Sequence, residues 1–426
     1  MTVVKNSLII FLFFLFALPA YSQTPDSIYY KNIRTVKLYN AGDQLSLPVL
    51  NLNSNDQAEL HFDDLDADVK YYYYTYQLCN NDWQPVNLSE FDYIKGFTQN
   101  RITTYRTSSI AYVRYTHYQV TLPERNCTPS RSGNYLVKVF LDGDTSKLVF
   151  TKRLMILDNK AVIKAQVVQP YTPQYFRTHQ KIQFNINITG LNSFNANQQV
   201  KVIILQNHRW DNAIKNIAPT FIRGSTLEYN TEETSVFPAG KEWRWLDIRD
   251  FHLQSDRVKS ADYNRNSTEI YMQPDMDRAA QRYVYYRDLN GMYMVENTTG
   301  VNPYWQSDYA DVHFYLKPSE SFIDADVYLA GEMTNYKLTD SLKMKFNGDK
   351  GLYETNMLLK QGYYSYTYVA IDKNNPAKRY ELEGNYFETE NEYTILVYYR
   401  SFTGRADELI GVSKINSRTD NPGFSF

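Results

Sequence analysis

Short apolar segments alternate with polar turns along most of the chain. The clearest apolar run is residues 202–205, VIIL, which has the composition of a strand buried on both faces. The residues that follow it directly are Gln206, Asn207, His208, Arg209, Trp210, Asp211 and Asn212. They carry amides, charges and an indole, and we find neither a helical nor a strand period in them. The pattern predicts a buried strand that ends in a polar loop, and Trp and Arg at the centre of such a loop are typical of a recognition surface.

A second segment, residues 240–250, has similar chemistry in the sequence GKEWRWLDIRD. Alternation along a strand places Trp243 and Trp245 on one face and Arg244 on the other. The candidate protein-binding residues of the two segments are therefore Asn207, Arg209, Trp210, Asp211, Trp243, Arg244 and Trp245. The alternative is structural: because Trp is mostly buried wherever it occurs, these indoles could cover the ends of a β-sandwich.

The spacing of strands and turns predicts an all-β protein of tandem immunoglobulin-like or fibronectin-like β-sandwich domains. The strand-like segments fall into an N-terminal domain at residues 23–158, a central domain at 159–308 and a third domain at 309–400. Residues 255–286 fit no clear period, so we expect a long excursion at one edge of the central domain. Residues 401–426 are predicted to form a polar, loosely held tail.

The N-terminus has the pattern of a secretory signal peptide. Lys5 precedes an apolar run at residues 7–18, and Ala20-Tyr21-Ser22 forms a small-x-small cleavage motif. The run is too short to span a bilayer comfortably, and we find no longer one later in the sequence. We expect residues 1–22 to be removed, leaving an exported protein that does not span the membrane and, without a nearby Cys, carries no lipid anchor.

Charge and cysteine content narrow the function further. The 47 acidic residues slightly outnumber the 45 Lys and Arg, and no basic block occurs, so nucleic acid is not an expected partner. Cys79 and Cys127 form a possible disulfide. However, Cys79 ends a predicted strand, and alternation points its side chain away from the core face of that strand. The residues assigned to that core face are Tyr72, Tyr74, Tyr76 and Leu78.

Motif searches give no catalytic or metal site. No two of the six His lie within four residues of each other, and no His, Cys and Asp follow a metal-ligand spacing. The sequence lacks a nucleophile elbow, a phosphate-binding Gly loop and an H-E-x-x-H motif. The Asp-rich segment at residues 63–68 lacks the Gly and Glu of an EF-hand and is interpreted as a solvated turn. We predict a protein that is not an enzyme and has no cofactor.

Residues 327–336 (VYLAGEMTNY) and 359–372 (LKQGYYSYTYVAID) resemble the glycogen-binding, early-set sandwich modules of branching enzymes and kinase β subunits. Tyr336 stands where that family usually has a sugar-stacking Trp, and Thr367 stands where a Lys would contact the glycan. The resemblance implies the fold of the third domain more than a carbohydrate site. We expect no useful affinity for α-glucans.

Four motifs occur along the mature chain in the order found in one family. They are YQLCNNDW at residues 76–83, SGNYLV at 132–137, QNHRWDN at 206–212 and WRWLD at 243–247. The chain thereby resembles the plug proteins of the type IX secretion system of Bacteroidetes, although Trp243 and Trp245 stand where the family often has Phe and Tyr, and Lys241 where it often has Asn. The resemblance implies a periplasmic protein that is held at the outer membrane by a protein partner, the translocon barrel, whose periplasmic mouth it closes. The alternative function is an exported glycan-binding accessory protein that uses the third domain.

Overall fold

The computed structural model describes residues 24–191, 195–253, 255–265, 267–319, 322 and 324–420. The predicted signal peptide, residues 1–22, lies outside the described residues. Within them the chain forms thirty-one strands, one four-residue helix, α1 (Ala196–Gln199), and three single 3-10 turns. The predicted all-β class is therefore confirmed, while the immunoglobulin-like identity of the sandwiches stays a prediction. None of the helices in the described residues is long and apolar enough to cross a membrane.

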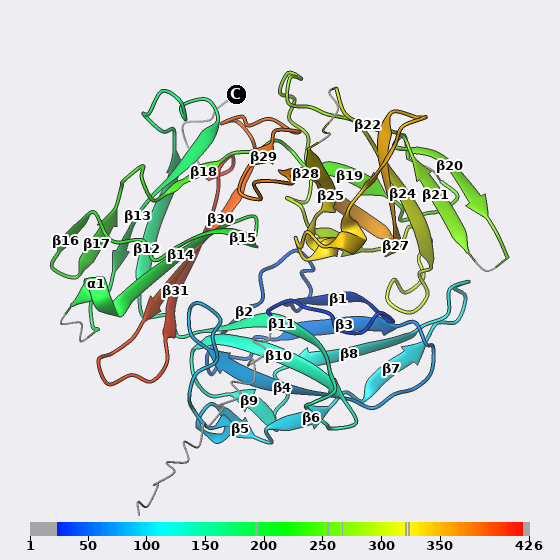
Figure 1. Cartoon of the computed structure of the whole chain (residues 1–426). Coiled ribbons are helices and arrows are strands. Elements are labelled where there is room, and N and C mark those ends of the chain that lie inside the picture. The colour runs from blue at the N-terminus through cyan, green and yellow to red at the C-terminus, as the bar shows by residue number, and fades with distance from the viewer. Residues whose placement is uncertain are drawn as a thin grey trace, which may run out of the picture.

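The first domain contains β1–β11 and lies at the bottom of Figure 1. One sheet has the order β1-β3-β8-β7, and the other has the order β2-β11-β10-β4-β6. Phe62 and Leu60 of the first sheet share an apolar core with Tyr74 and Val137 of the second. The strands of the first sheet are β1 (Ile33–Asn40), β3 (Ala58–Asp64), β7 (Thr104–Thr107) and β8 (Thr116–Leu122). Those of the second are β2 (Val49–Asn51), β4 (Tyr72–Cys79), β6 (Gln99–Arg101), β10 (Gly133–Leu141) and β11 (Leu148–Leu157), and β5 (Ile94–Gly96) pairs with β9 (Cys127–Pro129).

The second domain is assembled from two distant parts of the chain. One sheet has the order β12-β13-β17-β16, with β18 also paired to β13, and the other has the order β15-β14-β30-β31. The strands of the first sheet are β12 (Val162–Val168), β13 (His179–Asn187), β16 (Phe221–Arg223), β17 (Thr226–Tyr229) and β18 (Val236–Pro238). Those of the second are β14 (Val200–Gln206), β15 (Arg209–Lys215), β30 (Glu392–Tyr399) and β31 (Glu408–Asn416).

The third domain contains β19–β29 and is inserted between β18 and β30 of the second (Figure 1). Its first sheet is β19-β28-β23, with β25 and β29 also paired to β28, and its second is β20-β21-β24-β27-β26, with β22 paired to β24. The strands of the first are β19 (Arg244–Asp247), β23 (Tyr293–Val295), β25 (Ala325–Ala330), β28 (Gly362–Asp372) and β29 (Arg379–Tyr380). Those of the second are β20 (Val258–Tyr263), β21 (Thr268–Met272), β22 (Asp275–Met276), β24 (Tyr309–Lys317), β26 (Lys345–Asn347) and β27 (Leu352–Lys360).

This connectivity differs from the predicted division of the chain at residues 308 and 400. Strand β30, predicted in the third domain, pairs with β14 of the second along the whole of β14. Residues 255–286, predicted as an edge excursion, supply β20, β21 and β22 to a sheet of the third domain. The expectation of a loosely held tail is wrong for residues 408–416, because β31 pairs with β30 and buries Leu409 and Ile410. Linear order alone did not reveal that a domain is inserted between two strands of another.

The sheet β15-β14-β30-β31 is buried on both faces, as the VIIL run predicts. Val202 and Ile204 face the other sheet of the second domain, whereas Ile203 and Leu205 face the first domain. Alternation divides β30 in the same way, so Leu396 and Tyr398 also face the first domain. Their contacts there include Leu136 and Met155, on the outer face of β10 and β11. One apolar layer therefore joins the first domain to the second.

A buried ion pair joins the first domain to the third. Lys360 Nζ lies 2.5 Å from Asp63 Oδ2, and neither side chain is exposed. The other Asp63 oxygen lies 2.6 Å from His117 Nδ1, and Tyr309 donates its hydroxyl hydrogen to Asp63 Oδ2. Although burial opposes ionisation, Lys360 and His117 hold the pKa of Asp63 below its ordinary value. Asp63 of the first domain is thus paired with Lys360 and hydrogen-bonded to Tyr309 of the third domain, which fixes how the two domains meet.

The two cysteines are free and buried in different apolar layers, so the possible disulfide between Cys79 and Cys127 is not present. Tyr72, Tyr74, Tyr76 and Leu78 point into the core of the first domain, as predicted. Cys79 points the other way, into the layer that faces the second domain, whereas Cys127 lies in the core. Burial raises the pKa of each thiol to about 12, which keeps both protonated.

Thiol titration tests this assignment. Under non-reducing conditions the native protein is expected to show no rapidly reacting thiol, because reaction requires an accessible thiolate. The same protein unfolded in guanidinium chloride is expected to show both thiols of Cys79 and Cys127. An unfolded, non-reduced sample without reactive thiols would mean that the cysteines are bridged.

The apolar layer between the first two domains can be tested with Leu396→Ala. The side chain is fully buried, so the substitution is expected to cost roughly 2–5 kcal/mol of unfolding free energy. The matched control is Leu253→Ala, whose side chain is 75% exposed, and its expected effect is within about 0.5 kcal/mol. Denaturant unfolding measures both, and equal effects would contradict burial of this face.

Candidate binding residues at the domain junctions

The polar segment after β14 is a strand rather than a loop. Asn207 and His208 form a two-residue turn, both with positive φ of 54° and 59°, and β15 then runs back antiparallel to β14. Positive φ at both central positions defines a type I′ hairpin turn, which Asn at the first position favours. The prediction of a polar loop is therefore wrong, because residues 209–215 form strand β15. The strand period was not evident because β15 lies at a sheet edge, where polar side chains occupy positions on both faces.

The turn of the β14–β15 hairpin is fixed to β30 and holds the first candidate, Asn207. The buried Asn207 side chain donates to Asn391 Oδ1 over 2.8 Å and accepts from the Glu392 N–H over 2.9 Å. His208 Nε2 lies 2.6 Å from Glu392 Oε1. Asn207 therefore serves to position the hairpin and has little surface to offer a partner.

Arg209 joins the hairpin to the third domain. Its guanidinium donates to both carboxylate oxygens of Asp211 over 3.1 and 2.6 Å. The guanidinium carbon also lies 5.5 Å from the ring centre of Trp243 and 5.2 Å from that of Tyr336. The faces of these aromatic rings attract the positively charged guanidinium. About one fifth of the Arg209 side chain remains exposed. The structure thus brings Arg209 and Asp211 of the first predicted segment together with Trp243 of the second.

Trp210 joins the hairpin to the first domain. Its ring meets Trp83 edge to face, with centroids 5.1 Å apart. The Arg153 guanidinium lies 5.0 Å from Trp83 and 4.9 Å from Trp210, and it also forms an ion pair with Asp26. Trp210 remains half-buried and is therefore both a structural contact and a surface residue.

Trp243 is buried against the third domain. Its ring packs over Gly291, where an added Cβ would lie 2.8 Å from the indole, so a larger residue does not fit. Its backbone N–H donates to Asp288 Oδ2. Burial raises the pKa of Asp288 to about 7, so the carboxyl that holds Trp243 titrates near neutral pH.

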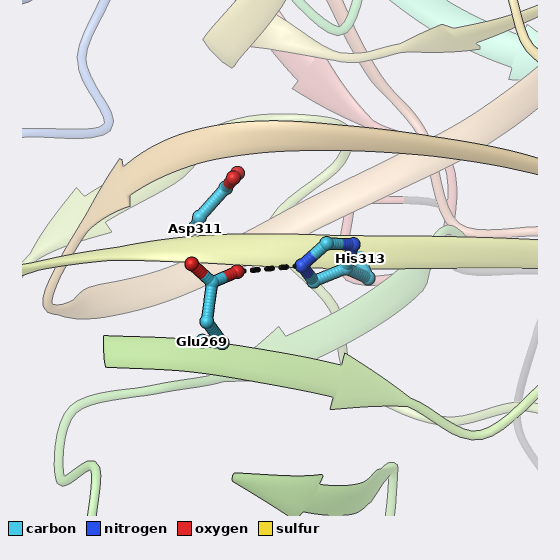
Figure 2. A group of neighbouring side chains, drawn as sticks. All are labelled: Glu269, Asp311 and His313. Carbon is cyan, nitrogen blue, oxygen red and sulfur yellow. Dashed lines mark hydrogen bonds and ion pairs between the residues drawn. The ribbon is translucent and has the colours of Figure 1, made fainter. Parts of the chain in front are cut away.

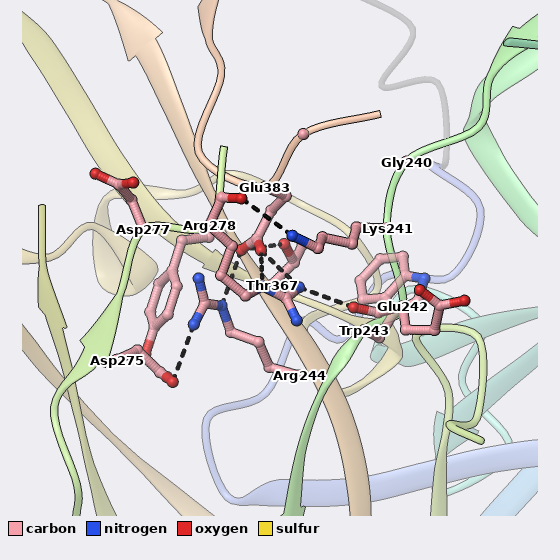
Figure 3. Close-up of polar contacts among 12 residues, drawn as sticks. Gly240, Lys241, Glu242, Trp243, Arg244, Asp275, Asp277, Arg278, Thr367 and Glu383 are labelled. Atoms are coloured by element: carbon pink, nitrogen blue, oxygen red, sulfur yellow. Dashed lines mark hydrogen bonds and ion pairs between the residues drawn. The ribbon is translucent and has the colours of Figure 1, made fainter. Parts of the chain in front are cut away.

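Arg244 is buried at the centre of a polar network in the third domain (Figure 3). It donates to Asp275 Oδ1 over 3.0 Å and to Glu383 Oε1 over 2.9 Å. Arg278 also pairs with Glu383 and donates to the Glu242 carbonyl oxygen over 2.8 Å. Removing one partner from such a network leaves a buried charge unpaired. Arg244 is therefore a scaffold residue, although its sequence position suggested a binding role.

Trp245 completes the set and is half-buried on the outer face of β19. Its ring stacks on Tyr363 with centroids 6.1 Å apart, and the Arg257 guanidinium lies 5.7 Å from the ring. Asn207, Trp243 and Arg244 thus support the fold, whereas Arg209, Trp210, Asp211 and Trp245 keep exposed surface. A binding role for these residues stays a prediction.

Two cavities lie beside these residues. One of about 260 Å³ is lined by side chains of all three domains, including Asp26, Arg153, Trp210 and Lys337. Another, of about 540 Å³, lies between the hairpin and the third domain. Sequence reasoning did not identify Arg153 or Lys337, because each is an isolated cation whose partners are distant in sequence.

The positions that suggested a glycan site are occupied within the protein. The Tyr336 ring lies against Arg209 and Trp243, and its hydroxyl donates to the Gly291 carbonyl oxygen over 3.1 Å. Thr367 donates to Glu383 Oε1 over 3.1 Å. Both residues are engaged in contacts between and within domains, which gives a physical reason to expect no α-glucan binding there.

Comparison with known proteins identifies the class of the first domain. Residues 33–158 match the family model described as the first domain of the type 9 secretion system plug protein, and this domain belongs to that family. The suspected resemblance is thereby confirmed for this part of the chain. No curated protein matches the sequence.

A solved structure extends the likeness over nearly the whole chain. It is a hypothetical protein from Parabacteroides merdae, 29% identical in sequence, with a TM-score of 0.87 over 92% of this chain and 99% of that one. The three-domain arrangement is therefore shared by a second protein. Dimeric latent PorU from Porphyromonas gingivalis gives a TM-score of 0.16 at 9% identity over 90% of this chain and 34% of that one, which is too low to indicate a common fold.

Asp288→Asn tests the carboxyl that holds Trp243. Between its ordinary pKa of 3.8 and the raised value of about 7, the folded protein binds a proton that the unfolded chain does not. The contribution of this group to stability therefore falls as the pH rises through that window, and Asn removes this loss. The melting temperature of the variant relative to wild type is expected to increase from about pH 5 to about pH 8.

The pH trend is the decisive quantity for Asp288, because Asn offers one acceptor oxygen in place of two and could lower stability at every pH. Asp256→Asn, at an exposed aspartate, is the matched control and is expected to show no such trend. A flat difference for Asp288→Asn would contradict the raised pKa.

Proposed function

We propose that this chain is a non-enzymatic periplasmic plug that binds and closes the periplasmic opening of the type IX outer-membrane translocon. The observation that carries the proposal is the match of residues 33–158 to the first domain of the type 9 secretion system plug protein. A plug acts through its shape and its contacts with the barrel, so it requires no catalytic group. Its association with the outer membrane is through this protein partner.

The way the domains are joined suits a plug. Domains in one chain usually move relative to each other unless their interface is large and apolar. Here the first and second domains share the apolar layer that includes Leu205 and Leu396, and the first and third share the buried Lys360–Asp63 pair. A body held in this way keeps its shape against the walls of a pore.

The β14–β15 hairpin is the part of the surface that we assign to docking, together with Trp245. Arg and Trp are the residues most often responsible for binding energy at interfaces, and Arg209 and Trp210 both keep exposed surface. Asp211 is exposed beside them and keeps the guanidinium of Arg209 in place. Asn207, Trp243 and Arg244 hold this surface in position.

Capture of the translocon from detergent-solubilised outer membrane by the immobilised chain tests the proposal. Arg209→Ala is expected to weaken binding by about 2 kcal/mol, roughly 30-fold, and to cost about 1 kcal/mol of stability through its lost contacts with Trp243 and Tyr336. Arg223→Ala, which removes a 73% exposed side chain of the same type from β16, is the matched control and is expected to bind normally.

Trp210→Ala is expected to cost about 2 kcal/mol of stability, less than the roughly 3–5 kcal/mol of a wholly buried Trp, in addition to weakening capture. If Arg209→Ala and Trp210→Ala fold and retain the translocon as wild type does, the hairpin is not the docking surface. If the wild-type chain captures no translocon, the plug function itself is wrong.

A further inference from the structure

Three carboxylates lie in direct register across neighbouring strands of the third domain. Asp262 on β20 is paired with Glu269 on β21, and Glu269 is paired with Asp311 on β24. The alternate positions of these strands, such as Ile270 and Val312, point into the core. The three acids therefore project from the outer face of the sheet, where Asp and Glu are generally depleted from strands.

This arrangement is unfavourable without a cation. Like charges directly opposite each other on neighbouring strands destabilise a sheet. Within the part of the chain that the structure describes, neither Lys nor Arg forms an ion pair with any of the three. The other close group of carboxylates, Asp64, Asp66 and Asp68, differs because Lys70 Nζ lies 2.7, 2.6 and 3.0 Å from their oxygens. An ammonium group thus fills the centre of that group, whereas among the described residues no Lys or Arg is paired with Glu269 or Asp311.

His313 adds a nitrogen ligand beside the carboxylates of Glu269 and Asp311 (Figure 2). Its Nε2 lies 2.7 Å from Glu269 Oε2, and one ligand atom from each of Glu269, Asp311 and His313 lies within 4.8 Å of the others. A tetrahedral metal held at about 2.0–2.2 Å by each ligand has its donor atoms roughly 3.3–3.6 Å apart, so the side chains must move closer together to bind one. All three side chains are half-exposed, so small rotations can bring them together without disturbing the core.

Neighbouring side chains orient two of the three ligands. The Tyr271 ring stacks on the His313 imidazole with centroids 4.6 Å apart and an interplanar angle of 13°. Asn356 donates to Asp311 Oδ2 over 2.7 Å, which leaves the other carboxylate oxygen available. Contacts of this kind fix ring and carboxylate orientation in metal sites.

We propose that Glu269, Asp311 and His313 bind a divalent transition-metal ion on the outer face of the third domain. One imidazole and two carboxylates suit Zn²⁺ and its neighbours, whereas Ca²⁺ and Mg²⁺ take oxygen ligands almost exclusively. The three ligands leave at least one coordination position for water or for a side chain of another protein. Sequence spacing did not reveal the site because Glu269 and His313 are 44 residues apart and are brought together only by the parallel pairing of β21 with β24.

Isothermal titration of the metal-free full-length protein with Zn²⁺ tests the proposal. One equivalent is expected to bind with a dissociation constant well below about 1 mM, and Ca²⁺ is expected to compete poorly. Affinity is expected to fall as the pH is lowered, because protons compete for the imidazole and carboxylates. His313→Ala and the nearly isosteric Asp311→Asn are each expected to weaken binding at least about tenfold.

The matched control is His252→Ala, which removes an exposed histidine of the same domain. The His252→Ala variant is expected to bind Zn²⁺ as tightly as wild type does. Zn²⁺ is expected to raise the melting temperatures of this variant and of wild type equally. The proposal is overturned if wild type shows no saturable binding of Zn²⁺ below about 1 mM, or if His313→Ala and folded Asp311→Asn bind as tightly as wild type.

Discussion

Burial of the sheet β15-β14-β30-β31 on both faces is the constraint on which the arrangement of the molecule depends. One face completes the core of the second domain, and the other packs on the outer face of β10 and β11 of the first. The third domain is inserted in the chain between β18 and β30, and β30 belongs to this sheet, so the same sheet fixes where the chain leaves that domain. The β14–β15 hairpin is consequently held at the junctions, where Arg209 contacts the third domain and Trp210 contacts the first.

Charged groups at the junctions add geometric selectivity to this apolar layer. The Lys360–Asp63 pair is wholly buried, and burying two charges costs much of what their attraction returns. The pair therefore acts mainly on the relative orientation of the first and third domains. If the two domains were misaligned, both charges would be buried and unpaired, which costs several kcal/mol. Arg153 and Arg209 act more mildly. Arg153 lies beside Trp83 of the first domain and Trp210 of the second, and Arg209 of the second domain lies beside Trp243 and Tyr336 of the third.

Features that follow from local periodicity, such as buried strands and the faces to which their side chains point, can be predicted from the sequence. The VIIL run indicated a strand buried on both faces, and Tyr alternation in β4 correctly oriented Tyr74 and Cys79. Contacts between segments that are distant in the sequence could not be predicted from the sequence alone. Arg244 was taken for a candidate binding residue because its partner Glu383 is 139 residues away. The domain insertion was missed because β14 and β30 pair across an even longer separation. The hairpin was missed because both faces of β15 carry polar side chains.

The central claim is that this body closes the translocon, and the electrical conductance of the purified translocon in a planar lipid bilayer tests it most directly. Addition of the chain to the periplasmic side is expected to abolish most of the open-pore conductance, and addition to the opposite side is expected to leave it unchanged. Closure that requires the periplasmic side is the result the plug function predicts. An unchanged conductance at saturating protein, with the chain folded and bound, would contradict it.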